Sequence, residues 1–168
     1  MSIAIYFKDD HVTIDARKLS MLKEKLSASP LKRARFCLHK SPREKVQEML
    51  IAICKDTHIR PHRQKHKRKT YTLIEGRISV AFFGEDGQVI RRVELGPASG
   101  GGAFLYTFPA GQWHTVCCLS ETAVYLETLA GPYVKAQTEF APWEAAPEEA
   151  ADGRLGRGQQ YLSFSKRA

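Results

Sequence analysis

The segment TYTLIEGRISVAFFGEDGQVIRRVEL, residues 70–95, decides the fold of this chain. It contains three short runs rich in β-branched and aromatic residues, and these runs are separated by two turn sequences, Glu75-Gly76 and Glu85-Asp86-Gly87. Runs of this length with glycine turns between them are typical of antiparallel strands. The segment therefore predicts three consecutive β-strands, without an intervening helix.

The same pattern continues on both sides of this segment. From His58 onward we predict seven strands, over residues 59–63, 70–74, 77–83, 88–95, 103–108, 114–119 and 122–129. Short strands that recur at a spacing of about 10 residues indicate an antiparallel sandwich or barrel. The fold class predicted for this region is mainly β.

The N-terminal part predicts a short strand over residues 3–7 and then two helices. Asp15 is a helix N-cap candidate, and the first helix ends before Ser29-Pro30. The second begins at Ser41-Pro42-Arg43-Glu44, which has the form of a capping box, and carries an apolar stripe of Val46, Met49, Leu50 and Ile53. We therefore expect a two-helix extension whose Val46–Ile53 face packs on the barrel.

Composition changes again near Pro142, where an acidic, alanine-rich and then glycine-rich stretch begins. We read this stretch as a mobile linker, with residues 161–164 as a candidate edge strand. The chain then divides into an N-terminal extension (residues 1–56), a β-barrel (57–141) and a C-terminal tail (142–168).

Charge and composition restrict the functional classes. The 168 residues include 26 Lys and Arg against 18 Asp and Glu, for a net charge of +8. The longest apolar runs are too short to span a membrane, and the four cysteines lack metal-binding spacing. The N-terminus also lacks the pattern of a signal peptide. We expect a cytoplasmic protein with no membrane partner.

Basic residues concentrate between Arg60 and Lys69, with three histidines among or beside them. Such a cluster indicates an anionic partner, or alternatively a solvated basic loop. Nucleic-acid binding rests on charge alone, since no recognition motif with interleaved aromatic residues accompanies the cluster. A small anionic molecule is the partner that we favour.

Two motifs carry chemistry. The first is Pro61-His62-Arg63-Gln64, followed by Lys69 and by Glu75-Gly76, and the second is Phe108-Pro109-Ala110-Gly111-Gln112-Trp113-His114. Residues two apart on a strand share one face of the sheet, so histidines placed in this way can meet inside a barrel.

These motifs resemble those of the cupins, and more narrowly those of the WbuC-type cupin metalloproteins. The resemblance extends over roughly residues 15–148 and includes 29–35, 38–39, 59–63, 73–77, 83–87, 109–115, 127–128 and 131–133. It implies a double-stranded β-helix (jelly-roll) barrel that commonly forms homodimers. Dimers would also protect the edge strands of such a sandwich. The family is often associated with bacterial surface-polysaccharide clusters, and its reaction is not established.

The departures from the family pattern concern its metal ligands. The second motif histidine falls at Gln64 and the glutamate at Lys69, so that only His62 and His114 keep their ligand types. Glutamine is a poor ligand and a protonated lysine repels a cation. We expect a divalent metal (Ni, Zn or Fe) to bind weakly or not at all, with His66 as a substitute ligand if one exists.

Two functions remain open from the sequence, and we favour the first, a WbuC-type protein with a degenerate metal site, without assigning it a specific reaction. One is a small-molecule enzyme of the isomerase or epimerase type acting on a sugar or sugar nucleotide, with Lys69, Tyr71 and Glu127 as candidate catalytic residues. The other is a metal-free module that binds an anionic small molecule. Candidate ligand-binding residues in either case are Arg60, Arg63, Tyr71, Tyr106, Trp113 and Tyr133.

Overall fold

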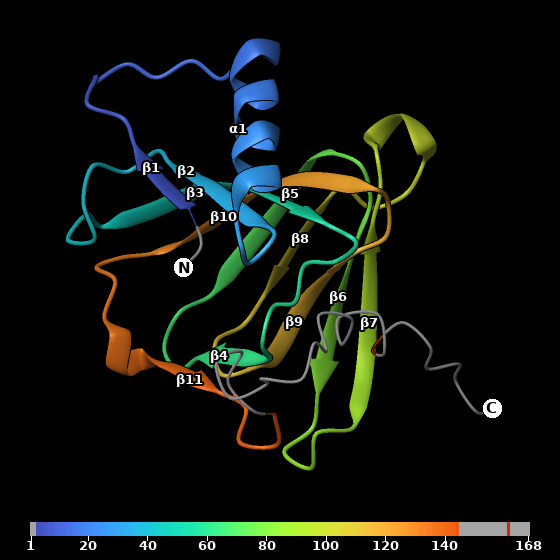
Figure 1. The fold of residues 1–168 in the computed structure, drawn as a ribbon. Coiled ribbons are helices and arrows are strands. Elements are labelled where there is room, and N and C mark those ends of the chain that lie inside the picture. Colours follow the sequence, from blue (N-terminus) through green and yellow to red (C-terminus); the bar gives the residue numbers. More distant parts are fainter. Residues whose placement is uncertain (1–2, 145–160, 162–168) are drawn as a thin grey trace.

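The computed structural model describes residues 3–144 and residue 161, and these form two facing β-sheets with one α-helix (Figure 1). The N-terminal elements are β1 (Ile3–Tyr6), α1 (Ala16–Ala28), β2 (Arg33–Cys37) and β3 (Val46–Cys54). The barrel continues with β4 (His62–Gln64), β5 (Lys69–Glu75), β6 (Ile78–Phe83), β7 (Val89–Leu95), η1 (Ala98–Gly100), β8 (Leu105–Phe108), β9 (Trp113–Cys118), β10 (Thr122–Ala130), η2 (Lys135–Gln137) and β11 (Thr138–Phe140).

The strand order is that of a jelly roll. The first sheet runs β1-β2-β3-β10-β5-β8 and the second runs β11-β4-β9-β6-β7. The pairs β3–β10, β4–β9, β5–β8 and β6–β7 are all antiparallel and nested, as in one long hairpin. Winding this hairpin so that its successive parts fall in two sheets produces the double-stranded β-helix. The mainly β jelly-roll prediction is confirmed for the described residues.

The predicted second helix is wrong, because residues 46–54 form the central strand β3. This strand pairs with β2 on one side and β10 on the other. Its Leu50 and Ala52 pack toward α1, whereas its Ile51 and Ile53 face the barrel interior. A strand buried on both faces has a nearly continuous apolar sequence, and such a run also fits a helical stripe.

The capping-box residues upstream of β3 form a turn instead. The backbone N–H of Lys40 donates to the carboxylate of Glu44 at 2.9 Å, and that of Arg43 donates to the Ser41 hydroxyl at 3.2 Å. These residues therefore hydrogen-bond locally, but not in the pairing of a capping box, and no helix follows them. Pairing of residues 46–54 with two strands overrides the helical signal.

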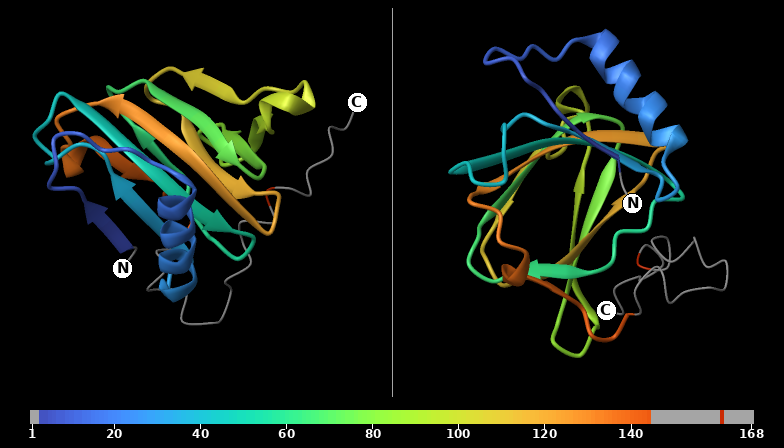
Figure 2. Two further views of the ribbon diagram at one scale, coloured as in Figure 1. Left: turned by 90° about the horizontal axis from the view of Figure 1, so that it is seen from above. Right: turned by 60° about the vertical axis from the view of Figure 1, so that its left-hand side comes forward.

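The first predicted helix is confirmed as α1. Asp15 caps it by accepting a hydrogen bond from the backbone N–H of Lys18 at 2.9 Å. Its Leu22 and Leu26 are buried against the outer face of the first sheet, and Figure 2 shows α1 outside the barrel. The helix that covers the barrel is thus α1 and not the Val46–Ile53 segment.

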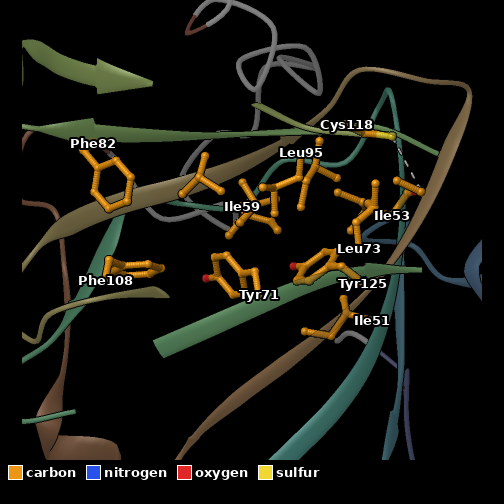
Figure 3. Packing of buried hydrophobic residues seen from close by; sticks show 14 residues of the cluster. Ile51, Ile53, Ile59, Tyr71, Leu73, Phe82, Leu95, Phe108, Cys118 and Tyr125 are labelled. Carbon is orange, nitrogen blue, oxygen red and sulfur yellow. Dashed lines mark hydrogen bonds between the residues drawn. The ribbon is translucent and has the colours of Figure 1, made fainter. Parts of the chain in front are cut away.

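The barrel interior is filled by apolar and aromatic side chains from both sheets. Figure 3 shows the rings of Tyr71, Tyr125, Phe82 and Phe108 between the sheets, and the Tyr71 ring centroid lies 5.3 Å from that of Tyr125. Tyr71 and Tyr125 are almost completely buried. Tyr71, Phe82 and Phe108 also lie against the His114 ring, so the aromatic interior adjoins the polar residues described below.

Two further expectations concern other parts of the chain. The predicted linker and edge strand in the tail lie outside the described residues, except for residues 142–144 and Tyr161. The Tyr161 ring packs on Phe83 with centroids 5.0 Å apart. No helix among the described residues is long and apolar enough to cross a membrane.

Candidate functional site

Three basic side chains from three strands meet inside the barrel, near the residues at which β4, β5 and β9 begin. His62 on β4 and His114 on β9 are direct cross-strand partners, and their ring centroids lie 4.5 Å apart. Lys69 reaches them from β5 on the opposite sheet, with Nζ 3.1 Å from Nε2 of His62 and 3.2 Å from Nε2 of His114. Lys69 and His114 are buried, and His62 is half-buried.

The backbone sets the orientation of both imidazole rings. Nδ1 of His62 lies 3.0 Å from the carbonyl oxygen of Arg60, and Nδ1 of His114 lies 2.8 Å from that of Gln112. A carbonyl only accepts, so in each ring Nδ1 carries the hydrogen and donates it. The remaining nitrogen of each neutral ring, Nε2, is then an acceptor that faces Lys69.

Burial keeps the two imidazoles neutral. The pKa of His62 is lowered from 6.5 to about 3, mainly by burial and secondly by the positive charge of Lys69. Burial, followed by Lys69 and His62, also holds the pKa of His114 well below its ordinary value. Both rings therefore accept hydrogen bonds from Lys69 near neutral pH.

Glu127 supplies the negative charge of the cluster. Its Oε2 lies 3.6 Å from Nζ of Lys69, and its carboxylate accepts a hydrogen bond from the Tyr71 hydroxyl. Burial lowers the pKa of Lys69, and Glu127 opposes this effect. The three donors of a lysine ammonium thus face two imidazole nitrogens and one carboxylate, which is the arrangement that fits the protonated amine.

A divalent metal does not fit this arrangement. It would need the Nε2 lone pairs of His62 and His114, and both point to the Lys69 nitrogen. An ammonium group next to the ligands also repels a metal cation. Within residues 3–144 and 161, no three His, Cys, Asp or Glu side chains are grouped as metal ligands.

The other two predicted metal positions do not join this cluster. Gln64 is buried on β4, but its side-chain amide donates to the Thr138 hydroxyl on β11 at 2.7 Å. His66 is exposed in the bend that follows β4. The structure thus directs Gln64 toward the neighbouring strand and leaves the suggested substitute ligand at the surface.

The predicted ligand-binding arginines are engaged within the protein. Arg63 forms ion pairs with Glu139 at 2.6 Å and Glu85 at 2.8 Å, and these carboxylates raise its pKa. Arg60 donates to the carbonyl oxygen of Ala141 at 3.0 Å. Much of the basic cluster is therefore paired with groups from distant parts of the sequence.

The predicted aromatic residues lie in three different places. Tyr71 and Tyr106 belong to the interior, where the Tyr106 ring stacks on Phe108 at 5.9 Å. Trp113 belongs to a separate cluster on the other face of β9, with the Arg63 guanidinium 4.1 Å from its ring. Tyr133 is exposed in the loop after β10. Of these candidates, only Tyr71 is shown touching the Lys69 cluster, through Glu127.

Sequence reasoning missed the contribution of β2. Arg33 on this strand acts electrostatically on Glu127, Tyr125 and Lys69, although it lies 36 positions before Lys69. The Arg33-Ala34-Arg35 alternation was the available signal, since residues two apart on a strand share a face.

Comparisons with known proteins support the fold. A family model described as a domain of unknown function (DUF6016) matches residues 14–95. A conserved protein of unknown function from Streptococcus pyogenes superposes with a TM-score of 0.50 and 12% identity, over 80% of this chain and 98% of that chain. No protein in a search of curated sequences matches the chain.

Two further solved structures show lower scores. An uncharacterized conserved protein with a double-stranded β-helix domain from Klebsiella pneumoniae has a TM-score of 0.49 and 17% identity, over 67% of this chain and 87% of that chain. Peruvianin-I, a cysteine peptidase from Thevetia peruviana latex, has a TM-score of 0.46 and 15% identity, over 57% of this chain and 55% of that chain. The chain therefore matches only about half of the latter protein, and at these identities a likeness concerns the fold alone.

Proposed function

We propose that this protein is a metal-independent, cupin-like binding module for a small anionic molecule. One observation carries the proposal: Nζ of Lys69 lies 3.1 and 3.2 Å from the two imidazole nitrogens that a metal would require. In this proposal the lysine ammonium, opposed by Glu127, is the cation at the centre of the site. An ammonium group cannot coordinate a ligand as a metal ion does. The site would therefore act on a ligand through its positive charge and through oriented hydrogen bonds.

The surrounding groups support binding over acid–base catalysis. His62 and His114 use both ring nitrogens within the protein, and the Glu127 carboxylate already faces Lys69 and the Tyr71 hydroxyl. A general acid or base must exchange a proton with its substrate, and these groups are committed to one another. A ligand bound next to Lys69 would add contacts to side chains that are already held in place by their hydrogen bonds to one another.

The resemblance to WbuC-type cupins selects the compounds to test. It points to sugar derivatives, including sugar nucleotides of surface-polysaccharide metabolism, and the anionic members of this class match the proposed site. The alternative, a sugar isomerase or epimerase with a degenerate metal site, predicts turnover and a metal requirement. The binding module predicts neither.

The test uses the untagged full chain in two measurements. Elemental analysis should find no stoichiometric Ni, Zn or Fe. Calorimetric titration in the presence of EDTA should show binding of sugar phosphates, uronic acids or sugar nucleotides but not of the matching neutral sugars. Stoichiometric metal in the purified protein, or failure of every anionic compound to bind, would overturn the proposal.

A further inference from the structure

The arginines of β2 lie on the face of the first sheet that lines the barrel interior. Arg33 and Arg35 are the cross-strand partners of Ile53 and Ile51, and both isoleucines belong to the interior cluster. The intervening Ala34 packs on the opposite side, toward α1. Because side chains alternate along a strand, the two guanidinium groups belong to the interior side.

The two arginines form no close ion pair within the described part of the chain, although the Glu127 carboxylate acts on Arg33 electrostatically. Among the described residues, Arg33 and Arg35 take part in no ion pair, whereas Arg63 has two. Nε of Arg35 is buried and has no hydrogen-bond partner, as is also the case for Nε of Arg60, while the Arg35 side chain hydrogen-bonds that of Cys37. Both side chains are only half-buried, so they remain reachable from solvent. An incompletely paired guanidinium in a partly buried position is costly unless an anion offsets it.

The two charges also act on each other and on the Lys69 cluster. Burial lowers the pKa of Arg33, and the positive charge of Arg35 lowers it further, while Tyr125 and Glu127 act in the opposite direction. The charge of Arg33 likewise contributes to lowering the pKa of Lys69 and of His62. Arg33 and Lys69 therefore both interact with the carboxylate of Glu127, and Arg35 interacts with Arg33 and with Tyr125.

We propose that Arg33 and Arg35 form an oxyanion subsite that holds the carboxylate or phosphate group of a small molecule next to the Lys69 cluster. This inference rests on the proposed binding function and assigns the anionic group to the N-terminal extension, not to Arg60 and Arg63. Guanidinium groups present paired N–H donors whose geometry matches both kinds of oxyanion. The Tyr125 hydroxyl lies on the neighbouring part of the same face, and burial keeps it protonated by raising its pKa.

The experiment compares Arg33→Met and Arg35→Met with the wild type, using inorganic phosphate, a hexose 6-phosphate and a hexuronate as probes and the neutral hexose as a blank. Arg68→Met is the matched control, because Arg68 is exposed and donates to the Thr107 hydroxyl without a carboxylate partner. We expect each β2 variant to lose about tenfold or more in affinity for the oxyanions, as for a charged hydrogen bond. The control should stay within about twofold of the wild type.

The outcomes separate the two proposals. If the wild type binds none of the oxyanions, the proposed binding function fails. If the wild type binds them and both β2 variants bind equally well, the function stands and the subsite is wrong. Should a methionine variant not fold, Arg33→Lys and Arg35→Lys keep the charge and remove only the paired donors. Folded lysine variants with wild-type affinity would overturn the subsite.

Discussion

The side-chain nitrogen of Lys69 lies 3.1 Å from Nε2 of His62, although the two residues stand on opposite sheets of the barrel. The lysine therefore crosses the interior and connects β5 to β4. Since His62 is also the cross-strand partner of His114, this one side chain ties the first sheet to two strands of the second. It has a structural role as well as the functional role proposed above.

Lys69→Met should destabilise the fold strongly. It leaves Glu127, which faces the ammonium at 3.6 Å, without its nearest cation, and removes the donor from two imidazoles. Breaking a buried charge pair costs about 3–5 kcal/mol. The control is Lys65→Met, which removes a more exposed ion pair with Glu139 and should cost under about 1 kcal/mol. Urea denaturation of both variants measures the difference, and equal losses would contradict this account.

Stability should fall as the pH is lowered from 6.5 to about 3. The folded-state pKa of His62 is about 3, below its ordinary 6.5, so in this window the unfolded chain binds the extra proton. The free energy of unfolding then decreases by up to about 1.4 kcal/mol per pH unit for each such imidazole. His114, whose pKa is also lowered, contributes in the same direction.

The control for this pH dependence is a pair of substitutions. His62→Gln should reduce the slope of unfolding free energy against pH between pH 4 and 6, whereas substitution of the exposed His66 should leave the slope nearly unchanged. Denaturant midpoints at several pH values provide the measurement. An unchanged slope in His62→Gln would show that this ring is protonated in the native state.

Gln64→His combined with Lys69→Glu should create a metal site. The double variant carries the ligand types of the cupin motif at positions 62, 64, 69 and 114, and it removes the ammonium that repels a cation. It also removes the Gln64 amide that bonds Thr138, and strand parity puts position 64 on the same face as His62. We expect Ni²⁺, Zn²⁺ or Fe²⁺ to bind about tenfold more tightly, or better, than to the wild type. Gln64→His alone is the control, because it retains Lys69. Tight stoichiometric binding by the wild type would argue that the lysine is displaced.

Gly76→Ala should be far more damaging than Gly111→Ala. Both glycines have a positive φ, +77° and +79°, but a Cβ at Gly76 would lie 2.3 Å from the carbonyl oxygen of Thr122, whereas nothing lies within 4 Å of one at Gly111. The shared backbone strain costs about 1–2 kcal/mol, and the clash at Gly76 adds to it. Thermal unfolding of the two variants measures the excess, and similar melting temperatures would refute it.

Much of the fold follows from local sequence patterns. The alternation over residues 70–95 identified β5, β6 and β7 to within about two residues, because each strand has turn residues at its ends. Asp15 likewise marked the start of α1. Local patterns wrongly predicted a helix over residues 46–54. The two faces of this strand are buried in different clusters, so its sequence lacks the alternation of polar and apolar residues that indicates a strand.

The candidate site divides in the same way. The sequence by itself determined that His62 and His114 could meet inside a barrel and that Lys69 stands where the related motif has an acid, since strand parity and spacing are local properties. Only the tertiary structure decided which charges are neutralised. Arg63 lies 76 positions from Glu139 and pairs with it, while Arg33 and Arg35 form no close ion pair with any carboxylate of residues 3–144. Charge pairing depends on which distant segments fold side by side, and no local pattern records that.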